Sequence, residues 1–278
     1  MSAKKILEFN ASGPGAVLKV LQALLGDKPG AFEVLHHQNY SADLLDDASL
    51  ALFSFAEAQK LLPQLPTLPP MAKSLQCFDA FSPEEGKWYP RLFLYEALRS
   101  VLVESARDLD NRSPAFVVGE GAELRVVSSV CALLGFAEVY LIGENSEVLA
   151  EDVRILSRGY FGVKFKVLPV EELTIQPVSG SLMINTVNMN QHENLLSDLS
   201  YFNFLKSTGY VLDCYLGHLQ SPLLEEAEKA GLRVLQPASV LQSLVELCLD
   251  KIGMSEMYSP VELQSLIVKI SKEISSSV

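Results

Sequence analysis

The residues best placed to do chemistry in this chain are two closely spaced glycines. Gly119-Glu120-Gly121 follows a short apolar run at 116–118 and precedes a helical spacing of apolar residues that begins at Leu124. In a dinucleotide-binding turn, the first glycine permits the sharp bend, the second lets the backbone approach a pyrophosphate, and the third packs the helix on the strand. Gly119 and Gly121 supply the first two, whereas the bulky Leu124 stands at the third position. The turn is therefore a candidate for nucleotide binding, although its pattern is incomplete.

Two acids allow a second interpretation of the same turn. Glu120 and Glu123 place negative charge at the start of the predicted helix, where a phosphate would otherwise lie. Carboxylates at a helix N-terminus also stabilise the helix dipole by themselves. The alternative to a nucleotide site is thus a turn whose own acids cap the helix and that binds no anion.

A further acid bears on the identity of the cofactor. The apolar run at 139–142 ends in Gly143-Glu144-Asn145. An acid at the end of the second strand, about 20 residues past the glycine turn, accepts hydrogen bonds from a ribose 2′-hydroxyl and repels a 2′-phosphate. If a nicotinamide cofactor binds here, Glu144 favours NAD over NADP.

The elements around this turn form a strand, helix, strand unit. The helix that begins near Leu124 is expected to end at Gly135 in the left-handed conformation, and the crossover is expected to be right-handed. Strands and helices continue to alternate up to residue 235, which predicts a parallel sheet covered on both faces. The expected strands lie at 163–167, 182–184, 210–214 and 232–235, and the expected helices at 147–156, 199–206 and 221–230.

The remainder of the chain predicts a second α/β region. Strands are expected at 5–9, 32–36 and 49–55, a turn or short helix start at 82–86, and a longer helix from Pro90. Ser259-Pro260-Val261-Glu262 has the spacing of a capping box before a last helix. The polar stretch 107–114 breaks the pattern, so we expect domains at 1–106 and 107–235, followed by C-terminal helices at 236–278.

Composition excludes several classes of partner. The net charge of −12 and the pI near 4.8 oppose binding to nucleic acid and to anionic membrane surfaces. No apolar run is long enough to span a membrane, and no secretory signal is recognisable. The four cysteines are widely scattered, so we expect reduced thiols, no metal site and a cytoplasmic protein. They are Cys77, Cys131, Cys214 and Cys248.

Residues 115–253 resemble the shikimate dehydrogenase family. The strongest stretch runs from Asp213 to Gly231 and is similar to the family's strand-end aspartate, short loop and Thr-Pro-Leu-Leu helix start, with Ser221 in the place of the threonine. Ile184-Asn185-Thr186 is similar to the family's Ile-Asn-Ala-Thr strand end. The first hundred residues resemble the family more weakly, mainly in spacing.

The resemblance implies an α/β fold with two domains around a cleft. An N-terminal α/β domain of the substrate type would precede a doubly wound, Rossmann-like domain of the dinucleotide-binding type. The C-terminal helices would return to pack on the first domain, and a monomer or homodimer is expected.

The chain departs from the family at its catalytic positions. The family's lysine falls on Ala58, its aspartate on Pro90, and its NADP-reading Asn-Arg-Thr on Gly143-Glu144-Asn145, which has no arginine. The two substrate-binding serines fall near Ala11 and Gly13. Reduction of a ketone at neutral pH needs a proton donor, and neither alanine nor proline can donate. We therefore expect a divergent member without ordinary shikimate dehydrogenase activity.

Three hypotheses follow for function. The chain is a pseudoenzyme that binds a small molecule or a protein, or it is an NAD-dependent oxidoreductase with an altered substrate, or it is an interaction protein whose cleft is filled by Trp88, Tyr89 and Leu124. The second hypothesis needs polar groups in the interdomain cleft; Lys60, Tyr89 and Asp213 are the catalytic candidates, with Arg91 and Tyr215 nearby, and Gly119, Gly121, Glu144 and Asn185 are the cofactor contacts.

Two of these assignments have simple structural alternatives. Asp213 either faces a ligand at the strand end or caps the following turn. His192 and His218 lie in expected loops, where we predict exposed side chains and the sequence identifies no partner.

Overall fold

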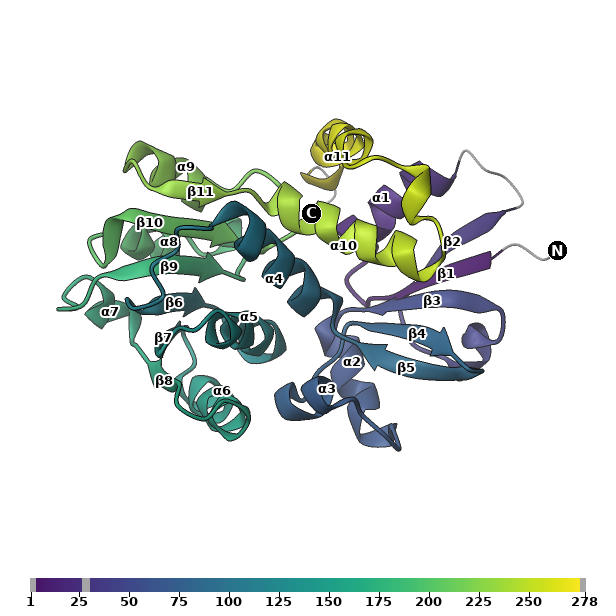
Figure 1. Cartoon of the computed structure of the whole chain (residues 1–278), viewed down its shortest axis with the longest axis horizontal. Coiled ribbons are helices and arrows are strands. Elements are labelled where there is room, and N and C mark those ends of the chain that lie inside the picture. Colours follow the sequence, from purple (N-terminus) through teal and green to yellow (C-terminus); the bar gives the residue numbers. More distant parts are fainter. Residues whose placement is uncertain (1–3, 27–30, 276–278) are drawn as a thin grey trace. The chain divides into compact units, whose positions relative to one another are not determined.

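The computed structural model describes residues 4–26 and 31–275, which form two compact units. Unit 1 comprises the chain up to Ala97 and again from Leu241 onward, and unit 2 comprises Leu98–Val240. The division falls inside two helices, α4 (Phe93–Ser105) and α10 (Pro237–Lys251) (Figure 1).

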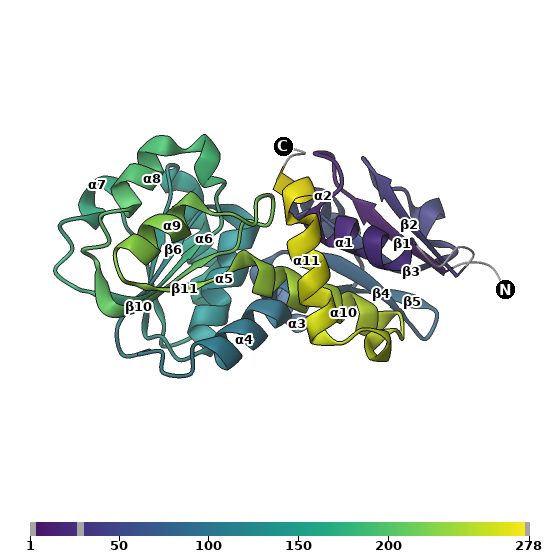
Figure 2. The same cartoon turned by 90° about the horizontal axis from the view of Figure 1, so that it is seen from above.

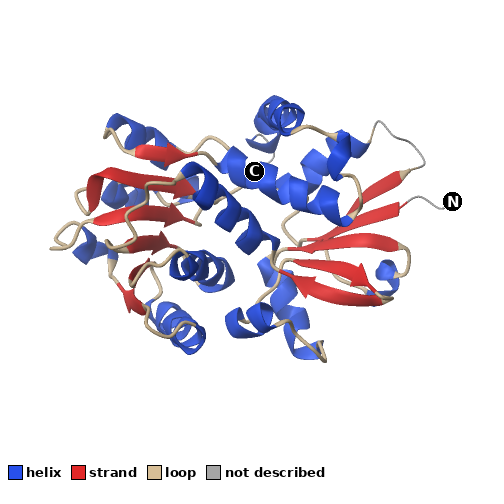
Figure 3. Ribbon diagram, in the orientation of Figure 1, coloured by secondary structure: helices blue, strands red, loops and turns tan. Residues whose placement is uncertain are grey.

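Unit 1 is built on a mixed sheet whose strand order is β2-β1-β3-β4-β5 (Figure 3). β1 pairs in parallel with β2 and β3, whereas β4 pairs antiparallel with β3 and β5. The strands are β1 (Lys4–Phe9), β2 (Phe32–His37), β3 (Ala48–Phe53), β4 (Ala80–Glu84) and β5 (Lys87–Arg91). The helices within the unit are α1 (Ala16–Leu25), α2 (Phe55–Leu61), α3 (Pro70–Leu75) and α11 (Pro260–Ser275), with short 3-10 turns at Ala42–Leu45, Leu62–Gln64 and Ser255–Met257.

A hairpin replaces the turn or helix start expected at 82–86. Residues 82–84 belong to β4, and the reversal is confined to Glu85 and Gly86, which both have positive φ, 50° and 76°. Two positive-φ residues form the kind of tight turn that matches the twist of a hairpin. The helix expected from Pro90 starts later, at Phe93, because Pro90 lies in β5. β5 is an edge strand, where a residue without an N–H is tolerated.

The C-terminal helix returns to the first unit, as expected. α11 packs against α1, and the hydroxyl of Tyr258 donates to the carbonyl of Leu24 over 2.8 Å. The capping box is also confirmed, because Glu262 Oε2 accepts from the Ser259 backbone and the Glu262 N–H donates to Ser259 Oγ.

Unit 2 contains an entirely parallel sheet with the strand order β11-β10-β9-β6-β7-β8. The strands are β6 (Ala115–Val118), β7 (Glu138–Ile142), β8 (Lys164–Val167), β9 (Gly180–Asn185), β10 (Leu205–Asp213) and β11 (Arg233–Leu235). The central pair is β6 and β9, and the chain moves outward from it in opposite directions. In open parallel sheets, ligands bind beyond the carboxyl ends of the strands at such a reversal of strand order.

Helices cover both faces of this sheet, as the alternating pattern predicts (Figure 2). α5 (Gly121–Leu133) and α6 (Ser146–Gly159) lie on one face, and α8 (Glu193–Leu199) and α9 (Pro222–Lys229) lie on the other. A short helix, α7 (Val170–Leu173), and a 3-10 turn at Met189–Gln191 complete the second layer. Phe116, Tyr140 and Phe204 pack ring against ring beneath that layer.

The helix expected at 199–206 is wrong. α8 ends at Leu199 and β10 begins at Leu205, with Phe202 between them at φ 47°. Phe202 and Phe204 are buried in the loop, so their spacing arises from packing of the connection and not from a helix. Within the described residues, no helix is both long and apolar enough to cross a membrane. All four cysteines are buried and none forms a disulfide.

Candidate functional site

The candidate site lies at the carboxyl edge of the unit 2 sheet. The strand pairings place Ile142 beside Val118, Val118 beside Asn185, and Asn185 beside Asp213. The loops that follow β6, β7, β9 and β10 therefore leave the sheet at one level. The glycine turn, Glu144, Asn185 and Asp213 all lie at this edge.

Gly119 is required by a close approach to the loop that follows β9. Its φ is 136°, and a Cβ at this position would lie 1.9 Å from Thr186 Oγ1. The Thr186 hydroxyl donates to the carbonyl of Val118 over 2.8 Å, so it is fixed beside the glycine. Only glycine combines this conformation with this contact. Gly119 is thus explained by packing alone, whether or not a ligand binds.

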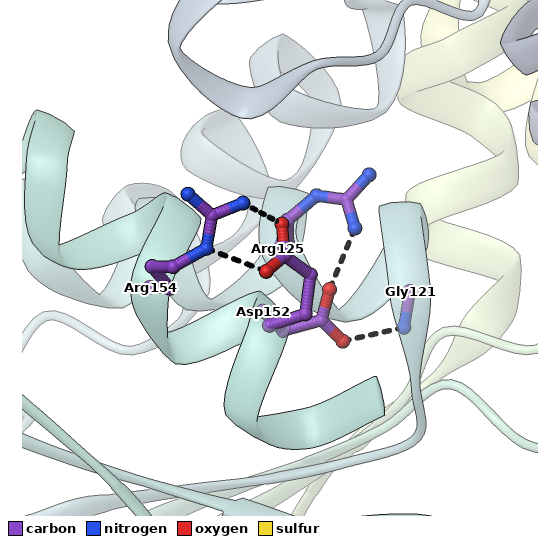
Figure 4. Close-up of polar contacts among 5 residues, drawn as sticks. Gly121, Arg125, Asp152 and Arg154 are labelled. Atoms are coloured by element: carbon purple, nitrogen blue, oxygen red, sulfur yellow. Dashed lines mark hydrogen bonds and ion pairs between the residues drawn. The ribbon is translucent and has the colours of Figure 1, made fainter. Parts of the chain in front are cut away.

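The second glycine begins α5, and its N–H is already taken by a carboxylate. Gly121 donates to Asp152 Oδ2 over 2.7 Å, and the other oxygen of Asp152 accepts from Arg125 Nη1 over 2.6 Å (Figure 4). Asp152 comes from α6 and is 1% exposed, and Arg125 is 6% exposed. A buried anion of the protein therefore lies at the N-terminus of α5, where the helix dipole favours negative charge.

The ion pair between Arg125 and Asp152 was not predicted from the sequence. Sequence separation hides it, since the partners are 27 positions apart. A signal was nevertheless present, because Asp152 shares its helix face with Leu149, Ile155 and Leu156, all buried. A lone charged residue in an apolar stripe indicates a buried partner of the opposite charge.

The acid inside the glycine turn contacts the end of the next strand. Glu120 Oε1 accepts the N–H of Asn145 over 2.6 Å, and Asn145 is the N-cap of α6. The Glu120 side chain makes no cap bond to its own helix, so the expectation that the turn's acids cap α5 is wrong for Glu120. Gly143 makes room for it, because a Cβ there would lie 2.9 Å from Glu120 Cγ.

Two pockets that share Gly143, Glu144 and Leu195 lie at this edge, and Glu120 lines the smaller of them. The larger, of about 370 Å³, lies between the ends of β7 and β8 and helix α8. Its lining includes Gly143, Glu144, Ser146, Leu149, Val167, Pro169, Val170, Glu171, Asn194, Leu195 and Asp198. The smaller, of about 200 Å³, is lined by Gly119, Glu120, Gly143, Glu144, Val187, His192 and Leu195. Among the described residues that line them, there are carboxylates and apolar groups but no lysine or arginine.

Glu144 lines both pockets, as expected of an acid at the end of β7. Its side chain is 68% exposed and lies 3.4 Å, from Oε1 to Nδ1, from His192. The sequence identified no partner for His192, and the structure places Glu144 beside it; the side chain is half-buried, where an exposed one was expected. This contact spans the loops after β7 and β9 and forms part of the wall of the smaller pocket.

Asn185 and Asp213 form a closed network behind the edge. Asp213 Oδ1 accepts from Asn185 Nδ2 and from the Tyr215 N–H, both over 2.9 Å, and Oδ2 accepts from Ser221 Oγ over 2.5 Å. Asn185 also exchanges hydrogen bonds with the Val187 backbone. Asp213 is 4% exposed and Asn185 is not exposed. Burial raises the pKa of Asp213 even though three donors oppose the shift.

The geometry of Asp213 fits the turn-capping alternative. Its hydrogen bonds hold the loop after β10 and, through Ser221, the start of α9. The amide of Asn185 is likewise used inside the fold, so it supports the edge and does not face a pocket.

The other catalytic candidates belong to unit 1. Lys60 pairs with Glu57 in α2, and its side chain is 62% exposed. Tyr89 is half-buried in β5. Ala58 and Pro90, at the positions of the family's lysine and aspartate, are both buried and carry no proton donor. Across the described ranges, no cluster of three or more His, Cys, Asp or Glu side chains is placed to hold a metal ion.

Comparison with known proteins supports the fold. No family model and no curated protein matches the chain. Among solved structures, quinate dehydrogenase from Corynebacterium glutamicum, in complex with NAD, has a TM-score of 0.78 and 12% identity over 96% of this chain and 99% of its own. Shikimate 5-dehydrogenase from Thermus thermophilus, in complex with NADP(H) and shikimate, has a TM-score of 0.68 and 16% identity over 97% and 99%.

A third neighbour has a different name. The ligand-free 5-ketofructose reductase of a Gluconobacter species has a TM-score of 0.73 and 12% identity, covering 97% of this chain and 99% of that chain. At these identities the similarity describes architecture. The chain therefore has the two-sheet α/β fold of the shikimate and quinate dehydrogenases.

Proposed function

We propose that this chain is a divergent shikimate dehydrogenase-like protein without ordinary shikimate dehydrogenase activity, and that it binds a small molecule at the carboxyl edge of the unit 2 sheet. The observation that carries the proposal is the hydrogen bond from Gly121 N–H to the buried Asp152 carboxylate. In a dinucleotide site, amides at the start of this helix hold the pyrophosphate. The residues present therefore do not fit a pyrophosphate at this turn.

The larger pocket supports the binding part of the proposal. Its volume of about 370 Å³ is within the range of small-molecule sites. The floor is apolar, from Leu149, Val167 and Leu195, and the polar groups include Glu144 and Asp198. A ligand that donates hydrogen bonds and carries no phosphate suits this lining, because carboxylates accept and repel anions.

The alternative function is an NAD-dependent oxidoreductase with an altered substrate. The observation that favours it is the position of Glu144, which ends β7 and lines both pockets with a largely exposed carboxylate. Such a carboxylate accepts the hydroxyls of a ribose and disfavours NADP. In this alternative, Lys60 and Tyr89 are the proposed proton donors.

An assay combined with a titration separates the two functions. We expect no oxidation of shikimate or quinate by the purified chain with either NAD or NADP. We also expect no heat in calorimetric titrations with either cofactor. The first probe for the larger pocket is adenosine, which has ribose hydroxyls but no phosphate. Turnover of shikimate would overturn the proposal. A dissociation constant for NAD below about 1 mM, which is roughly 4 kcal/mol of binding free energy, would favour the alternative. If an activity is then detected, its loss in Lys60→Ala or Tyr89→Phe would identify the proton donor.

A further inference from the structure

Two backbone N–H groups at this edge are occupied by the chain's own carboxylates. Gly121, at the start of α5, donates to Asp152, and Asn145, at the start of α6, donates to Glu120. Both helices are long, with 13 and 14 residues, and their N-terminal amides are the groups that would otherwise attract an anion. The two carboxylates differ in burial: Asp152 is 1% exposed, whereas Glu120 is exposed.

The Glu120 side chain passes close to the backbone of Gly143, where there is no Cβ to block it. Gly143 lies under its side chain, and a Cβ on Gly143 would come within 2.9 Å of Glu120 Cγ and 3.0 Å of its Oε1. The carboxylate thereby reaches from the glycine turn to the end of β7, 25 residues away in sequence, and ends in a 2.6 Å bond. Charge-assisted bonds of this length are stronger than neutral ones.

The pocket next to this bond has no lysine or arginine among the described residues that line it. Glu120 and Glu144 both line this smaller pocket, and its other polar side chain is His192. A phosphate there would meet two carboxylates and would find the Asn145 N–H already bonded. An uncharged ligand is not repelled by the two carboxylates and does not need the Asn145 N–H as a donor.

We infer that the Glu120 carboxylate is an internal occupant of the anion position between the glycine turn and the end of β7, and that it excludes phosphorylated ligands from the adjacent pocket. This inference rests on the proposed function and names the ligand class that the site rejects. Glu120 is thus a specificity-determining residue, and its removal should raise the affinity of the adjacent pocket for a phosphorylated ligand.

The test compares three variants with ADP as the probe. Glu120→Ala removes the carboxylate and frees the Asn145 N–H, whereas Glu120→Gln keeps an oxygen that can accept it. Glu123→Ala removes the same charge from the first turn of the same helix and is the matched control. We expect calorimetry to show at least a tenfold gain in ADP affinity for Glu120→Ala, and less than a threefold change for Glu120→Gln and for Glu123→Ala.

Several results would overturn the role of Glu120. These are an unchanged ADP affinity in a folded Glu120→Ala variant, an equal gain in Glu123→Ala or Glu120→Gln, and wild-type binding of ADP as tight as that of Glu120→Ala. Folding is checked by circular dichroism, and faster amide exchange of Asn145 in Glu120→Ala confirms that its bond is lost. The two proposals fail separately, since shikimate turnover by the wild type overturns the proposed function whatever Glu120 does.

Discussion

The two halves of the unit 2 sheet edge use polar residues in opposite ways. On the β9 and β10 side, Asn185, Asp213 and Ser221 are buried and bonded to one another. On the β6 and β7 side, the carboxylates of Glu120 and Glu144 are exposed and line pockets. Strand-end position is the same in both halves, so position alone does not distinguish a buried structural acid from one that lines a pocket. The burial of the side chain does.

The contrast also explains why the resemblance to the shikimate dehydrogenases is uneven along the chain. The stretch that carries it most strongly, residues 213–231, includes Asp213 and Ser221, whose hydrogen bonds hold the loop after β10 and the start of α9. The departures fall on Ala58, on Pro90 and on residues 143–145. The resemblance therefore follows the parts that maintain the scaffold, and this agrees with a fold retained at 12% to 16% identity.

The largest expected effect comes from breaking the buried pair between α5 and α6. Asp152→Ala leaves the Arg125 guanidinium buried without its carboxylate partner and removes the acceptor of the Gly121 N–H. We expect the free energy of unfolding to fall by about 3 to 5 kcal/mol, measured by urea denaturation.

A double variant separates charge from packing at the same place. Arg125→Met combined with Asp152→Leu removes both charges and keeps apolar volume, so it should be clearly more stable than Asp152→Ala alone. A loss of less than about 1 kcal/mol in the single variant, below the cost of an unpaired buried polar group, would mean that Asp152 does not hold this helix start.

A buried acid without a cation should respond to pH in the opposite sense to an ordinary salt bridge. Asp79 in unit 1 accepts the N–H groups of Phe93 and Leu94, both over 2.7 Å, and burial raises its pKa from 3.8 to about 7. The folded state therefore binds the proton more tightly than the unfolded state. The stability that this proton contributes is full below pH 4 and is lost as the pH rises to 7.

The measurement is the free energy of unfolding between pH 4 and pH 8. The rise in the pKa of Asp79 from 3.8 to about 7 corresponds to a decrease in the free energy of unfolding on the order of 4 kcal/mol over this range. Asp79→Asn cannot ionise and should flatten the profile. A variant profile as steep as that of the wild type would assign the dependence to other groups.

On the β9 and β10 side of the edge, we expect Asp213→Ala to cause an intermediate loss of stability. Removal of the carboxylate takes away the acceptor of one Asn185 N–H, of the Ser221 hydroxyl and of the Tyr215 N–H. An unsatisfied buried group costs about 1 to 3 kcal/mol, and thermal unfolding should show a loss of this size. Wild-type stability combined with lost ligand binding would instead return Asp213 to the binding residues.

Local patterns in the sequence predicted most elements of unit 2. The apolar runs at 116–118 and 139–142, with Gly135 at φ 89° between them, fixed the strand, helix, strand unit. Ser221 and Ser259 were recognisable caps because their bonds span three residues. Predictions that rested on such local signals were confirmed. The helix predicted across the loop at 200–204 is absent because burial determines the spacing of the apolar residues there. The turn or helix start predicted at 82–86 is a hairpin, because Glu85 has a positive φ.

The site was predicted less completely because its determining contacts join distant residues. Asp152 meets Gly121 across 31 residues, and Glu120 meets Asn145 across 25. The sequence located Gly119, Gly121 and Glu144 at the edge but could not show that two of the chain's own carboxylates already hold the N–H groups there. A pattern of residue types identifies a possible site, whereas occupancy depends on the fold.

The smallest effect on stability, and the sharpest test of the comparison, is expected at Glu144. Its carboxylate is 68% exposed, and its contact with the His192 ring at 3.4 Å lies at the surface, where such contacts contribute little. Glu144→Gln should therefore change the free energy of unfolding by no more than about 0.5 kcal/mol. The same variant removes the charge shared by both pockets, so binding of adenosine should change while folding does not. A loss of stability comparable to that of Asp213→Ala would place Glu144 with the structural acids, and the edge would then have one kind of strand end in place of two.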